Sequence, residues 1–101
     1  QSIKERKNVS ANGFIEATIL ITSKGNIHNR PLITFRGLPI YEKEEFQNGL
    51  EDEIDKTVKS FSLNNKKQET NLVDALKSTC RKFTKLKTGK RPLANINLVR
   101  I

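Results

Sequence analysis

The chain has few of the residues from which catalytic and metal sites are built. Its 101 residues include one cysteine, one histidine, no tryptophan and no methionine. A single cysteine excludes an internal disulfide, which fits a reducing, cytoplasmic setting. A single histidine excludes any metal site that needs two histidines of this chain. We therefore expect no metal centre and no cofactor in this chain.

Long apolar runs are missing as well. No segment approaches the roughly 20 residues that a membrane-spanning helix needs, and the first residues lack the charged-then-apolar pattern of a signal peptide. We therefore expect no membrane partner. The first residue is Gln rather than Met, so we expect a processed product or a piece of a longer protein.

The remaining candidates for chemistry are weak. His28 falls in or just after a turn, where a solvated side chain is the ordinary outcome. Cys80 falls on an apolar helical stripe, which favours a small buried residue over a nucleophile. The acids of residues 51–55 point in different directions around a helix and do not converge on one ion. No glycine-rich phosphate loop occurs, so the sequence predicts no catalytic residue.

The N-terminal part predicts a linker followed by a β-hairpin. Residues 1–13 are polar and end in Asn12-Gly13, which predicts a linker, with the domain proper at residues 14–101. Apolar residues alternate from Phe14 to Thr22, as expected for a strand with one buried face. A turn at residues 23–26 and a second strand at about residues 32–36 complete the hairpin.

The following pattern has a helical period. From about Lys43 to Phe61, apolar residues recur at steps of four and three, which predicts an amphipathic helix. A second helix is expected to be capped by Thr70 or Asn71 and to stop at Gly89. A last strand should begin after Pro92. The buried stripe of the second helix is predicted to be Leu72, Leu76, Cys80, Phe83 and Leu86.

The predicted order is β-β-α-α-β, which suits an α+β two-layer sandwich with a three-stranded sheet facing two helices. The pattern leaves open which hairpin strand pairs with the last strand. Two helices on one side cannot cover every apolar residue of the sheet. Uncovered apolar surface invites association, and the residues concerned are Phe14, Leu20 and either the Val99/Ile101 or the Ile96/Leu98 pair.

Charge is distributed unevenly along the chain. Residues 1–65 hold nine Lys/Arg and nine Asp/Glu, whereas residues 66–101 hold ten Lys/Arg and two acids, so the net charge of +8 lies in the last third. A basic run with no acid extends from residue 81 to residue 92, where helix passes into strand. Such a surface attracts phosphate groups. The predicted RNA-binding residues are Arg81, Lys82, Lys85, Lys87, Lys90 and Arg91.

Aromatic side chains for base stacking are scarce beside these cations. Phe46, Phe61 and Phe83 are needed in the core, which leaves Phe14, Phe35 or Tyr41. Any contact with nucleic acid should therefore be made to the backbone, with weak sequence selectivity. A charged face that only improves solubility is the alternative.

Several motifs resemble one known family. They are Phe35-Arg36-Gly37-Leu38-Pro39, the acidic helix after it, the basic second helix, and Lys87-Thr88-Gly89-Lys90-Arg91-Pro92 before a terminal apolar strand. Together they resemble the C-terminal domain of ribonuclease J, particularly its alphaproteobacterial form. The resemblance covers nearly the whole chain, and the segment that ends in Thr-Gly-Lys-Arg-Pro is its most specific part.

The resemblance implies a non-catalytic accessory domain of a zinc-dependent ribonuclease with endonuclease and 5′-to-3′ exonuclease activity. Zinc would be bound in an upstream catalytic domain, the partners would be that domain and RNA, and the accessory domain would support homo-oligomerisation. No catalytic residue can be carried over, because the metal-binding motif is not present here. Two alternatives stay open: a free-standing nucleic-acid-binding module, and a protein-interaction module whose acidic first helix meets a basic partner.

Overall fold

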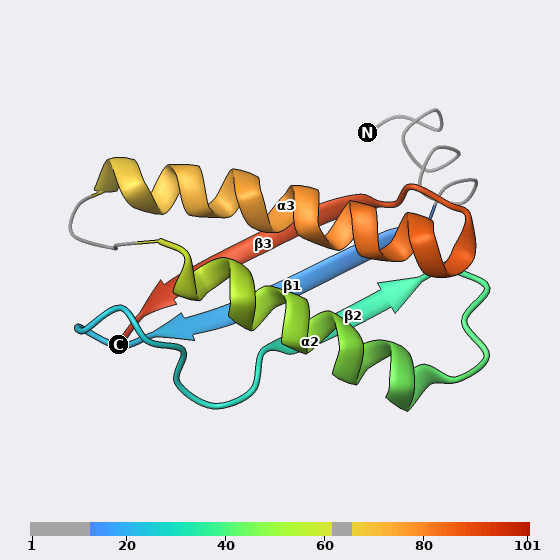
Figure 1. Ribbon diagram of the computed structural model, residues 1–101, viewed down its shortest axis with the longest axis horizontal. Coiled ribbons are helices and arrows are strands. Elements are labelled where there is room, and N and C mark those ends of the chain that lie inside the picture. Colours follow the sequence, from blue (N-terminus) through green and yellow to red (C-terminus); the bar gives the residue numbers. More distant parts are fainter. Residues whose placement is uncertain (1–12, 62–65) are drawn as a thin grey trace.

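The computed structural model describes residues 13–61 and 66–101. It contains five elements in the predicted order β-β-α-α-β (Figure 1). The predicted linker lies outside the described residues, apart from Gly13. The elements are β1 (Phe14–Ile21), β2 (Leu32–Arg36), α2 (Lys43–Lys59), α3 (Lys66–Thr88) and β3 (Leu93–Arg100).

The three strands form one mixed sheet in the order β2-β1-β3. β1 runs antiparallel to β2, with Ile15 opposite Phe35, and parallel to β3, with Ile15 opposite Ala94. The parallel pairing arises because the two helices return the chain to the end of the sheet at which β1 began. The last strand therefore adds to the first strand of the hairpin, which answers the question that the sequence pattern left open.

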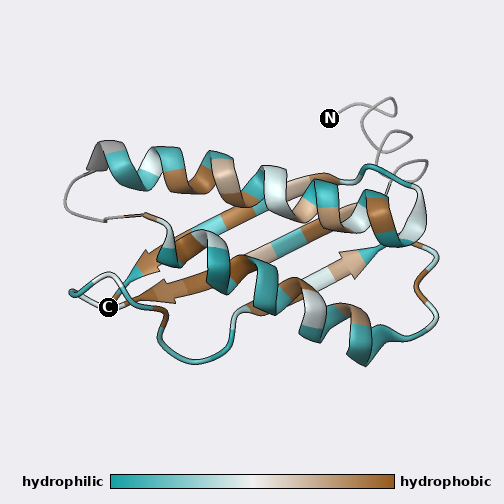
Figure 2. Ribbon diagram, in the orientation of Figure 1, coloured by the Kyte–Doolittle hydropathy of each residue, from teal (hydrophilic) through white to brown (hydrophobic). Residues whose placement is uncertain are grey.

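Both helices lie over the same face of the sheet (Figure 1). The predicted alternation of β1 is confirmed, because Ile15, Ala17, Ile19 and Ile21 are fully buried. α2 presents the predicted stripe to them, since its buried residues are Phe46, Leu50, Ile54 and Val58, and brown and teal positions alternate along it in Figure 2. The resulting core has a single layer between helices and sheet, as expected for a two-layer α+β sandwich. Its α2 and α3 members are Phe46, Leu50, Ile54, Val58, Leu72, Leu76 and Cys80.

Two predictions for α3 were wrong. The helix begins at Lys66, not after a cap at Thr70 or Asn71, because Lys, Gln and Glu are good helix formers and Glu69 in the first turn favours the positive end of the helix dipole. Leu86 is 81% exposed, whereas Thr84 is fully buried. These two residues are two positions apart and so lie about 160° apart around the helix, which means that burying one exposes the other. The predicted stop at Gly89 is confirmed by its φ of 79°.

Neither α2 nor α3 lies over the second face of the sheet (Figure 1). We call it the open sheet face. Its centre is polar, because the Nδ2 groups of Asn95 and Asn97 each donate to Glu16 Oε2 at 3.0 Å. Of the two pairs considered above, Val99/Ile101 is exposed, whereas Ile96 and Leu98 belong to the core. Apolar side chains on this face are Phe14, Leu20, Leu32, Leu93, Val99 and, just past β3, Ile101.

Candidate nucleic-acid interface

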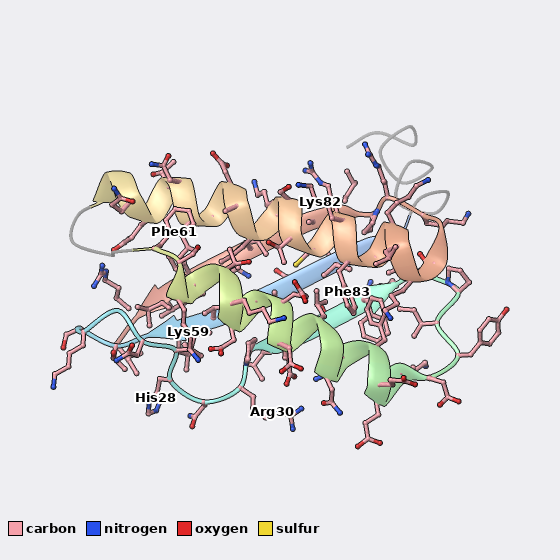
Figure 3. All side chains as sticks on the ribbon, in the orientation of Figure 1. His28, Arg30, Lys59, Phe61, Lys82 and Phe83 are labelled. Atoms are coloured by element: carbon pink, nitrogen blue, oxygen red, sulfur yellow. The ribbon has the colours of Figure 1, made fainter. Side chains whose placement is uncertain are left out.

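The last turns of α3 present their cations to solvent. Arg81 and Lys85 are one helical turn apart, and both are exposed together with their neighbour Lys82. Figure 3 shows Lys82 on the outer side of α3, while Phe83 points toward α2. The burial of Leu76, Cys80 and Thr84 on the inner side of the helix explains this arrangement. Packing of the core therefore places Arg81, Lys82 and Lys85 on the outer side of α3.

A shallow hollow of about 290 Å³ lies on this outer surface. Arg91 reaches it from the corner between α3 and β3, where the positive φ of Gly89 turns the chain. Four of the six predicted RNA-binding residues thus meet in one place, although they come from two segments. We call this site the cationic hollow, and it is lined by Ser78, Arg81, Lys82, Lys85, Leu86 and Arg91.

The structure places the other two predicted residues elsewhere. Lys87 Nζ lies 5.6 Å from the centroid of the Phe83 ring and belongs to the opposite side of α3. Lys90 is exposed at the corner but does not line the cationic hollow. Its backbone N–H donates to Thr88 Oγ1 at 3.2 Å. The cations of the basic run are therefore consecutive in the sequence but lie on more than one surface of the molecule.

The charges of the cationic hollow are only lightly compensated. In the described part of the chain, Arg81, Lys82 and Arg91 form no ion pair, whereas Arg30, Lys56 and Lys59 do. Lys85 Nζ donates to the carbonyl oxygen of Gly89, the residue just past the end of α3, at 3.2 Å. Cations at a helix C-terminus also interact favourably with its dipole. That interaction explains why lysines lie in the last turn of α3. It does not explain why Arg91, which lies outside the helix, joins them in the hollow.

Leu86 is the residue of this site that the sequence reasoning misplaced. It was expected in the core, yet it lies among the cations of the hollow with 81% of its surface exposed. None of the hollow's lining residues is aromatic. Phe35 packs edge-on against Phe46 at 5.4 Å between ring centroids. Phosphate contacts, with an apolar contact from Leu86, are what the arrangement can provide.

The described residues do not fit a zinc centre. Among them, no group of three or more His, Cys, Asp or Glu side chains gathers as a metal site would require. His28 is exposed. Cys80 is buried, and burial raises the pKa of its thiol to about 12. No helix in the described ranges is long and apolar enough to cross a membrane.

The family is decided by a match over the full length of the chain. The family model for the ribonuclease J C-terminal domain matches residues 1–101. The chain belongs to this family. Curated proteins gave no match to the chain. Membership confirms the resemblance seen in the sequence, and it implies an accessory role in ribonuclease J for this domain.

Proposed function

We propose that this domain is the non-catalytic accessory part of a cytoplasmic ribonuclease J-like enzyme and that it contacts the RNA backbone through the cationic hollow. The zinc-dependent endonuclease and 5′-to-3′ exonuclease chemistry would belong to an upstream catalytic domain of the same chain. The observation that carries the proposal is the convergence of Arg81, Lys82, Lys85 and Arg91 from two segments on one hollow. Such a site binds phosphates with little dependence on sequence.

The RNA proposal predicts a salt-dependent loss of affinity. Changing Arg81, Lys82 and Arg91 together to Gln should weaken binding of a fluorescein-labelled single-stranded 12-nucleotide RNA by about 10-fold at low salt. The slope of log affinity against log salt should fall by about two, since each contact with a single strand contributes about 0.7. Fluorescence anisotropy at several salt concentrations measures both quantities.

A matched control separates a site from general charge. The variant with Lys24, Arg36 and Lys43 changed to Gln also loses three positive charges, but from residues that do not line the hollow. It should retain most of the affinity and most of the salt slope. Equal losses in the two triple variants would show that the basic run only contributes to solubility and non-specific attraction.

The open sheet face supports a second part of the proposal, the association of two copies. Leu32 is 69% exposed and Ile101 59% exposed on a face that neither α2 nor α3 covers. Apolar residues flank the polar centre at Glu16 on both ends, through Phe14 and Leu93 at one end and Leu20 and Val99 at the other. A second copy offers the same pattern, so a two-fold contact can pair apolar with apolar and leave the polar centre hydrogen-bonded.

This part of the proposal predicts a specific loss of association. Changing Leu32 and Val99 to Thr keeps residues that suit strands but removes apolar contact area. The dissociation constant of the homo-oligomer should rise at least about 10-fold, because each change acts twice in a two-fold interface. Sedimentation velocity measures it. The control Leu86→Gln removes an exposed leucine elsewhere and should change nothing, whereas a wild-type chain that stays monomeric at about 1 mM contradicts the association.

A further inference from the structure

A second hollow lies on the other side of α3, between the last turns of that helix and the first turns of α2. Its volume is about 410 Å³, which is in the range of small-ligand and side-chain pockets. The loop before α2 forms one wall of it through Pro39, Ile40 and Tyr41. We call this site the aromatic groove. None of its lining residues belongs to the cationic hollow.

The floor of the aromatic groove is built from two phenylalanines and a glycine. The rings of Phe46 and Phe83 lie 5.3 Å apart between centroids, which is a favourable distance for tilted aromatic contacts. Gly49 allows the Phe83 ring to lie directly against α2, because a Cβ there would be 2.8 Å from Phe83 Cζ. The chain therefore has a close helix contact at this point and an apolar floor beside it.

The rim of the groove combines an exposed aromatic residue with two acids. Tyr41 is 92% exposed. Glu42 and Glu45 form no ion pair with any residue of the described ranges, whereas Glu51, Glu53 and Asp55 farther along α2 are paired with cations. Acids in a first helical turn stabilise the helix through its dipole. The dipole does not account for an isolated tyrosine in solvent or for the apolar floor beneath it.

We propose that the aromatic groove binds an extended peptide segment of a partner protein, with one apolar side chain on the phenylalanine floor and lysine or arginine next to it. Charge complementarity selects this occupant, since Glu42 and Glu45 lie on the rim. Lys87, held over the Phe83 ring, places a positive charge at the α3 side and so orients the basic residues toward the acids. Tyr41 can cover the bound side chain, as tyrosines do at interfaces. This site is independent of the proposed RNA contact.

The chain contains its own reporter for this site. Tyr41 is the only tyrosine, and there is no tryptophan, so tyrosine emission reports on the groove alone. The probe is the acetylated and amidated peptide Gly-Lys-Arg-Leu-Lys-Gly, titrated into the 101-residue chain at low salt. We expect a saturable change in Tyr41 fluorescence with a dissociation constant on the order of 100 µM, as for one anchored side chain with supporting charges. The same peptide with Ser in place of Leu should bind at least about 5-fold more weakly.

Two double variants test the role of the rim. Glu42→Gln with Glu45→Gln should weaken binding about 5-fold or more. Glu44→Gln with Asp52→Asn removes the same charge from α2 outside the groove and should leave binding within about 2-fold. No saturable change, equal effects of the two double variants, or equal binding of the serine peptide would each overturn the proposal. So would a change in emission that follows protein concentration alone, because a second copy would then be the occupant.

Discussion

Replacing Leu76 by alanine should destabilise the domain by about 3 kcal/mol. Leu76 is fully buried in the single core layer between helices and sheet, so its removal leaves a cavity that the neighbouring side chains fill only in part. Domains of this size have a total stability of about 5–15 kcal/mol. The loss is therefore a large part of the whole, and urea unfolding followed by circular dichroism should show a clearly lower midpoint.

The matched control for this change lies ten residues along the same helix. Leu86→Ala is the same substitution, and Leu86 belonged to the same apolar stripe in the sequence-based prediction. Because Leu86 is 81% exposed, its replacement should change the unfolding free energy by less than about 0.5 kcal/mol. A loss of 2 kcal/mol or more in Leu86→Ala would mean that the helix is rotated and that the predicted stripe was right.

The period of apolar residues was sufficient to predict the element order and most of the core. The predicted stripe takes every second residue of β1 and every fourth residue of α2, and all of these positions are buried. The same reasoning failed at the end of α3. A threonine in the stripe counts as polar, yet Thr84 is buried, and Leu86 had to leave the core as a consequence. Apolar spacing alone cannot show this, because it does not distinguish a buried threonine from an exposed one.

The candidate sites were harder to predict than the fold, because they depend on which segments meet. The basic run identified the cations of the cationic hollow, but not that Arg91 joins α3 residues while Lys87 turns to the opposite side. The aromatic groove left no signal in the sequence. It requires contact between residues 39–49 and residues 83–88, and it depends on Gly49, which in the sequence is only a weak helix former.

Cys80 should make the stability of the domain depend on alkaline pH. Burial raises the pKa of the thiol from an ordinary value of 9.0 to about 12, so the folded state holds a proton that the unfolded state releases earlier. The stabilisation is complete below pH 9 and is lost as pH rises toward 12, with a slope of about 1.4 kcal/mol per pH unit. The loss therefore approaches about 4 kcal/mol across this window.

Urea unfolding of the wild-type chain and of Cys80→Ala between pH 8 and pH 11, under reducing conditions, isolates this contribution. The two proteins differ only at residue 80, so the difference between the two curves belongs to the thiol. Cys80→Ala should be less stable at pH 8, because a buried side chain has been shortened, and the gap should close or reverse by pH 11. Parallel curves would show that the thiol ionises as easily in the folded domain as in the unfolded chain. Cys80 would then be accessible and could act as a nucleophile. The packing in the structure instead makes Cys80 an inert part of the core.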